Sequence, residues 1–168
     1  YAFRIQFWPH LYPLKRFIPM KFNTLLAALL FFFAVISIAS CKKDDQREID
    51  QKLIEDFINE HNLDADSTSS GLYYVIEEPG SSEHPTINDQ VTVNYIGFLL
   101  NGDVFDQDFN ITFGLDQVIP GWQEGIPLFG KGGKGLLIIP SHLGYGDRTL
   151  TGIPANSVIV FEIHLLDF

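Results

Sequence analysis

Val118-Ile119-Pro120-Gly121-Trp122-Gln123-Glu124-Gly125 is the stretch that decides the fold of this 168-residue chain. Residues 121–129, which begin within it, form the one place for a helix in the globular part, because the segments around them have strand patterns. Those segments alternate in polarity or are rich in apolar, Tyr and β-branched residues; they are 72–78, 91–95, 135–140 and 159–165. Many strands and one short helix predict an antiparallel domain of the α+β class.

Further motifs follow one another along the same region. Tyr95-Ile96-Gly97 ends a strand, Asn101-Gly102-Asp103-Val104-Phe105-Asp106 contains a turn, and the remaining motifs are Gly144-Tyr145-Gly146, Ile153-Pro154 and Val160 to Leu166. In this order and at this spacing, together with residues 118–125, they resemble the FK506-binding-protein (FKBP) family of peptidyl-prolyl isomerases. The resemblance covers about 71–168. It implies an antiparallel β-sheet wrapped around one short α-helix, and it implies that the protein is a peptidyl-prolyl cis-trans isomerase.

The resemblance also implies a binding and catalytic pocket. The residues on matching positions are Tyr95, Phe105, Asp106, Phe109, Val118, Ile119, Trp122, Tyr145, Ile153 and Phe161. Trp122 is expected to form the pocket floor and the apolar members its walls. The Tyr145 hydroxyl and the Ile119 N–H are expected to donate to substrate carbonyls, while Asp106 is expected to hold Tyr95 or to polarise the twisting carbonyl. Phe109 is reached by counting back from Val118, across a loop shorter than in short members of the family.

These residue types suit the chemistry of prolyl rotation. The barrier of ~18–20 kcal/mol comes from amide resonance, and an apolar pocket suits a twisted transition state that has lost charge separation. No bond breaks, so we expect no nucleophile, metal or cofactor. The expected partners are proline-containing polypeptides and macrolide inhibitors of the FK506 or rapamycin type. Two alternatives stay open: a weakly catalytic or non-catalytic chaperone module on the same fold, and an accessory lipoprotein of gliding machinery.

Charge and cysteine content exclude other classes. The net charge of −10 argues against nucleic acid as a partner. A single cysteine cannot form an internal disulfide or supply a Cys-rich zinc site. All 21 acidic residues follow Cys41, so the first 40 residues differ in charge from the rest of the chain.

Residues 20–40 have the pattern of a signal peptide. Met20, the only methionine, precedes Lys21 and an uninterrupted apolar run over 25–36, which is followed by small residues. A transmembrane helix is the alternative, but twelve residues span roughly 18 Å of a ~30 Å hydrocarbon core. Residues 1–19 are interpreted as upstream sequence or a misplaced start, the alternative being a genuine aromatic-rich arm.

Ile38-Ala39-Ser40-Cys41 resembles the lipobox of bacterial lipoproteins. That resemblance implies that Cys41 receives a lipid (palmitate among its acyl chains) and becomes the N-terminus. Lys42 is similar to an outer-membrane sorting signal. The sequence therefore predicts a lipid-anchored protein in the cell envelope of a Gram-negative bacterium, at the outer membrane, with the side of the membrane undetermined.

Residues 41–70 are expected to form a tether with a helix over about 46–61. Asp45 and Glu48 have the spacing of a capping box. Apolar residues then recur at helical spacing, at Ile49, Leu53, Ile54, Phe57 and Ile58. This stripe packs either on the domain, which we favour, or on a second copy. A polar linker over 64–71 leads into the isomerase domain, residues 71–168.

Overall fold

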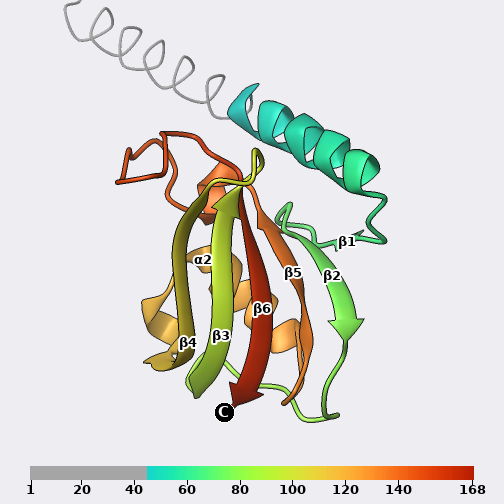
Figure 1. Cartoon of the computed structure of the whole chain (residues 1–168), viewed down its shortest axis with the longest axis vertical. Helices are drawn as coiled ribbons and strands as arrows, with labels where there is room; N and C mark the ends of the chain where they lie inside the picture. The colour runs from blue at the N-terminus through green and yellow to red at the C-terminus, as the bar shows by residue number, and fades with distance from the viewer. Residues whose placement is uncertain (1–44) are drawn as a thin grey trace, which may run out of the picture. The chain divides into compact units, whose positions relative to one another are not determined.

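A computed structural model describes residues 45–168 (Figure 1). The expected signal segment, the residues before it and Cys41 lie outside this part of the chain. None of the helices formed by residues 45–168 is long and apolar enough to cross a membrane. Residues 45–61 are helical, close to the expected range of 46–61.

Six antiparallel strands form one sheet in the order β1-β2-β5-β6-β3-β4. Their bounds are β1 Asp66–Ser67, β2 Tyr73–Glu78, β3 Gln90–Leu99, β4 Val104–Gly114, β5 Lys134–Ile139 and β6 Ile159–Asp167. The sheet and its single short α-helix confirm the FKBP-like fold expected from the sequence. The strands near 72–78, 91–95, 135–140 and 159–165 are all present as β2, β3, β5 and β6.

One face of the sheet holds the main core. Helix α2 (Pro120–Gly125) lies on this face, framed by the 3-10 turns η1 (Leu115–Gln117) and η2 (Ile126–Leu128) (Figure 1). The strands contribute alternate residues to it, as a period of two requires. On β6 these are Ile159, Phe161, Ile163 and Leu165, all buried. Gly121 lets α2 approach β5, because a Cβ there would lie 2.6 Å from an Ile139 methyl carbon.

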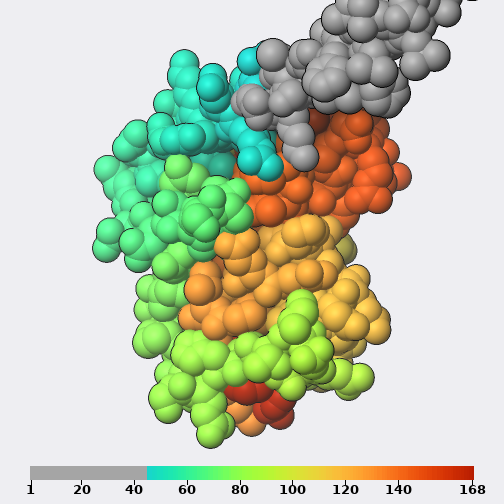
Figure 2. All heavy atoms as spheres, turned by 180° about the vertical axis from the view of Figure 1, so that it is seen from behind, coloured from blue at the N-terminus to red at the C-terminus, as the bar shows by residue number. Residues whose placement is uncertain are grey.

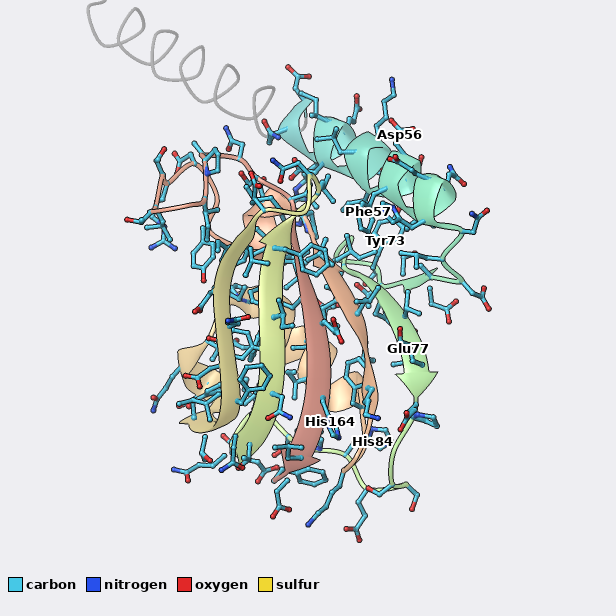
Figure 3. The ribbon with its side chains drawn as sticks, viewed as in Figure 1. Asp56, Phe57, Tyr73, Glu77, His84 and His164 are labelled. Carbon is cyan, nitrogen blue, oxygen red and sulfur yellow. The ribbon has the colours of Figure 1, made fainter. Side chains whose placement is uncertain are left out.

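The opposite face is covered at one end by the N-terminal helix. Ile54 and Phe57 are buried against Ile138 of β5 and Val160 of β6. Figure 3 shows Phe57 directed toward the sheet and Asp56 on the other side of the helix. The helix therefore docks on the domain, as favoured from its apolar stripe.

The stripe on this helix is only partly used. Ile49 and Leu53 belong to it by sequence but are 51% and 43% exposed. A polar residue takes the corresponding place in the contact with the domain, since Asp50 is fully buried.

Two strands were not expected from the sequence. The pair Asp66–Ser67 of β1 lies within the expected polar linker. Strand β4 occupies residues expected to form a turn and a loop, and most of its side chains are exposed because it is the edge of the sheet. An isolated antiparallel bridge between Leu150 and Ile153 closes the loop that precedes β6.

Candidate functional site

A cavity of about 340 Å³ opens on the α2 face of the sheet, toward the β4 edge. Its lining comes from β3, β4, β6, the η1–α2 segment and the loop after β5. The lining residues are Tyr95, Asp106, Phe113, Gln117, Val118, Ile119, Trp122, Tyr145 and Phe161. Seven of the ten residues expected in the pocket are among them.

Trp122 forms the floor of this cavity. Its side chain is 4% exposed, and three aromatic rings surround it. The ring centroid of Phe161 lies 5.0 Å from that of Trp122, Tyr95 lies at 5.1 Å and Phe113 at 5.3 Å. The first two contacts are edge-to-face, the arrangement that aromatic quadrupoles prefer. The floor is therefore held rigidly as well as kept apolar.

Phe105 supports the wall from β4. Its ring meets Phe161 edge-to-face, with centroids 5.6 Å apart. Both rings lie over Gly97, where an added Cβ would come within 2.6 Å of Phe161 and 2.8 Å of Phe105. The glycine of the Tyr95-Ile96-Gly97 motif thus leaves room for two aromatic side chains.

The polar groups of the cavity lie on its rim. The Tyr95 hydroxyl donates to Asp106 Oδ2 over 2.8 Å. Burial, and then the hydrogen bond to Asp106, raise the pKa of Tyr95 above its usual range. Burial and the nearby Asp106 charge also raise the pKa of Tyr145. Both hydroxyls are therefore protonated at neutral pH and able to donate.

The loop after β5 presents Tyr145. Arg148 Nε donates to the Tyr145 carbonyl oxygen over 3.2 Å, and its guanidinium lies 5.9 Å from the centre of the Tyr145 ring. Within residues 45–168 the Tyr145 hydroxyl makes no hydrogen bond to the protein. It is therefore free to donate to a ligand in the cavity.

Gln123 orients the backbone at the mouth of the cavity. Its side-chain Nε2 donates to the Val118 carbonyl oxygen at 2.9 Å and to that of Asp116 at 3.3 Å. The Val118 carbonyl and the Ile119 N–H belong to the same planar peptide unit, in which the two groups point in opposite directions. Fixing one therefore aims the other, and hydrogen bonding to the carbonyl also polarises the N–H. Sequence reasoning gave Gln123 no role, because its partners are backbone atoms.

Phe109 was expected to line the pocket, and the structure contradicts this expectation. It lies away from the cavity and is 63% exposed. Tyr95 pairs with Asp108 and Val93 with Ile111, so Phe109 and Asn110 together face the single residue Asn94 across a bulge. Asn110 has φ 56° and donates its N–H to Asn94 Oδ1. The extra residue reverses the side on which Phe109 emerges.

Phe113 takes the place expected for Phe109. It lies opposite Val91 and contacts Trp122. The signal for it was present in the sequence, since Ile111, Phe113 and Leu115 alternate with Thr112 and Gly114.

The other two residues that do not line the cavity support it. Phe105 stands behind Phe161, as described above. Ile153 is 5% exposed and belongs to the main core, where its bridge to Leu150 closes the loop that follows Tyr145. Residues 45–168 contain no group of three or more His, Cys, Asp or Glu side chains placed to hold a metal ion.

An antiparallel sheet with one short helix packed on one face, and with an aromatic-floored pocket between them, defines the FKBP-like class of fold. The chain belongs to the FKBP-type peptidyl-prolyl cis-trans isomerase family, whose family model matches residues 81–166.

Individual relatives agree with this assignment. FkpA of Buchnera aphidicola subsp. Schizaphis graminum is 50% identical over 105 residues, which make up 60% of this chain and 42% of the relative. FkpA of Escherichia coli K12 is 46% identical over 105 residues, or 60% and 39% of the two chains. The crystal structure of FkpA from Escherichia coli superposes with a TM-score of 0.65 and 37% identity, covering 86% of this chain and 70% of that one. The chain thus spans about two fifths of the length of these curated relatives.

Proposed function

We propose that the protein is a peptidyl-prolyl cis-trans isomerase that assists protein folding in the cell envelope. The observation that carries the proposal is the cavity over Trp122, which combines an apolar aromatic floor with hydrogen-bond donors on the rim. Membership of the family supports it.

The cavity matches the energetics of prolyl rotation. The two isomers differ by only ~0.5–1 kcal/mol, so a catalyst has to lower the barrier and need not drive the equilibrium. In the twisted state the amide has lost its resonance and is less polar than the planar ground state. A dry pocket over Trp122 favours that state, and removal of about 7 kcal/mol would accelerate rotation about 10⁵-fold.

Oriented donors add to this effect. The Tyr145 hydroxyl and the Ile119 N–H hold the carbonyls on either side of the proline, so that one half of the peptide is fixed while the other rotates. Asp106 holds the Tyr95 hydroxyl at 2.8 Å and thereby shapes the rim. No step requires a proton transfer or a covalent bond.

A proline-isomerisation assay tests the proposal. The full chain and a Tyr145→Phe variant are compared on a peptide whose trans isomer is cleaved by a coupled protease. We expect clear catalysis by the wild type and a several-fold lower kcat/KM for the variant. FK506 should inhibit turnover and quench Trp122 fluorescence, since Trp122 forms the floor. A wild type that does not exceed the uncatalysed rate, although folded, would refute the proposal.

A chaperone role is the second candidate. It is favoured by exposed apolar side chains on the β4 edge, where Val104 is 57% and Phe109 is 63% exposed. Such a module would bind extended apolar segments without needing turnover. Suppression of the aggregation of a proline-free client would support it, provided that the Val104→Ser, Phe109→Ser double variant loses the effect and keeps isomerase activity.

We further propose that Cys41 carries the lipid anchor and that residues 41–70 form the tether. The lipobox-like sequence before Cys41 supports this proposal, as does the signal-like segment 20–40. Growth with labelled palmitate should label the wild type and leave Cys41→Ala unlabelled. Equal labelling of both would exclude Cys41 as the attachment site.

A further inference from the structure

Asp50 and Ser141 are the only buried polar or charged residues in the part of the chain described, at 0% and 2% exposure. They contact each other. Asp50 Oδ2 accepts from the Ser141 N–H over 2.8 Å and from the Ser141 hydroxyl over 2.6 Å. Asp50 Oδ1 accepts from Gln46 over 2.7 Å. A buried carboxylate is costly unless such donors surround it, so this contact is a built feature of the fold.

Ser141 begins the short 3-10 turn η3 (Ser141–Leu143), which leads to Tyr145. The residue before it, Pro140, makes no side-chain cap. Asp50, which lies 91 positions earlier in the chain, supplies the missing acceptor for the first N–H of the turn. At the other end, the Gly144 and Gly146 N–H groups both donate to the Ser141 carbonyl oxygen, over 3.0 and 2.8 Å. Ser141 thus anchors the loop that carries Tyr145, because its N–H, its hydroxyl and its carbonyl oxygen are all hydrogen-bonded.

A second contact holds the same loop, this time from the linker between the N-terminal helix and β2. His142 Nε2 faces the Ser70 carbonyl oxygen at 3.0 Å and, because a carbonyl only accepts, carries the proton. The Ser70 hydroxyl lies 2.7 Å from Glu124 Oε2 on α2. In Figure 2 the surface of the N-terminal helix adjoins that of the segment after β5. Residues before the family-matched range of 81–166 therefore hold both the Tyr145 loop and α2.

We propose that Asp50 is a positioning residue for Tyr145: by capping Ser141 from the N-terminal helix it sets where the Tyr145 hydroxyl stands over the cavity. The inference rests on the proposed isomerase function for its effect on turnover, but not for its effect on Tyr145. According to this inference, the N-terminal helix contributes to the geometry of the pocket through Asp50.

The test uses the full chain in detergent micelles, labelled with ¹³C-tyrosine, and the variants Asp50→Asn and Ser141→Ala. Asp56→Asn is the matched control, because Asp56 is exposed on the same helix. The Tyr145 ring resonance is identified by its absence from Tyr145→Phe. We expect Asp50→Asn to shift this resonance and to lower kcat/KM about five- to tenfold, less than the loss of a whole charge-assisted hydrogen bond, because the amide oxygen of Asn still accepts but lacks the charge. Asp56→Asn should change neither.

Thermal melts separate positioning from folding. If Asp50→Asn lowers the melting temperature but leaves both the Tyr145 resonance and kcat/KM at wild-type values, Asp50 only docks the helix and the inference is wrong. If the variant does not fold, Ser141→Ala, which removes the hydroxyl alone, decides by the same two readouts. An inactive wild type would refute the proposed function, while the Tyr145 resonance would still decide the role of Asp50.

Discussion

The hydrogen bond between Tyr95 and Asp106 offers the sharpest test of the proposed mechanism. Two roles for Asp106 are open: holding the Tyr95 hydroxyl, or acting directly on the substrate carbonyl. The 2.8 Å contact favours the first. If it is correct, Tyr95→Phe and Asp106→Leu each break the same bond, and the double variant is no worse than the poorer single variant.

The structure sets the size of the effect. A hydrogen bond to a charged group contributes ~1.5–3 kcal/mol when it is shielded from water. Because Asp106 is exposed, we expect a smaller contribution of about 1–1.5 kcal/mol. At 1.36 kcal/mol per decade this corresponds to a five- to twelvefold loss of kcat/KM for each single variant and for the pair.

The measurement is a double-mutant cycle in the coupled proline-isomerisation assay, with thermal melts to confirm folding. Asp56→Leu, a change of the same kind on the exposed side of the N-terminal helix, serves as the control. Losses that multiply in the double variant would show that Asp106 acts on the substrate independently of Tyr95. A folded Asp106→Leu protein without any activity would refute catalysis by desolvation and orientation, and would require an acid–base step.

Three further predictions concern the same pocket. Gln123→Glu replaces the donor to the Val118 carbonyl with a carboxylate, so kcat/KM should fall about tenfold, whereas Gln90→Glu, the same change at an exposed position, should have no effect. Phe105→Ala should lower the free energy of unfolding by about 2 kcal/mol in urea melts, less than for a fully buried ring because Phe105 is half-buried; an unchanged stability would contradict its packing against Phe161. The raised pKa values of Tyr95 and Tyr145 predict that kcat/KM stays flat from pH 6 to 9. They also predict that the free energy of unfolding falls above about pH 10, because the tyrosines of the unfolded chain then lose protons that those of the folded chain keep. In Tyr95→Phe this fall should be smaller.

Local patterns in the sequence were enough for the α+β fold class, and the resemblance of its motifs to a family indicated most of the residues that line the cavity. The period of two in β3 and β6 survives in the structure because each strand buries one face against α2. Residues 118–125 place Val118, Ile119 and Trp122 together, since one turn of chain carries all three. Such positions depend on neighbours in the sequence, which a pattern can detect.

Other positions depend on partners that no local pattern reveals. The bulge at Asn110 arises where two residues of β4 face one residue of β3, so counting from Val118 put Phe109 on the wrong side. Strand β4 itself was missed because the part before Ile111 lies at the edge of the sheet, exposes polar residues and lacks a clean alternation. Nothing in the sequence around Asp50 indicates its partner, because only the fold brings Ser141 to it.

The two-sided covering of the sheet implies a gradient of local stability. Strands β5 and β6 lie in the middle of the sheet, with α2 over one face and the N-terminal helix over part of the other, whereas β4 has a neighbour on one side only. Amide hydrogens of β5 and β6 should therefore exchange with solvent only when the whole domain unfolds, and those of β4 through small openings. For the proposed function this means that the rim that carries Asp106 can adjust to polypeptides of different sequence while the floor formed by Trp122 keeps its shape.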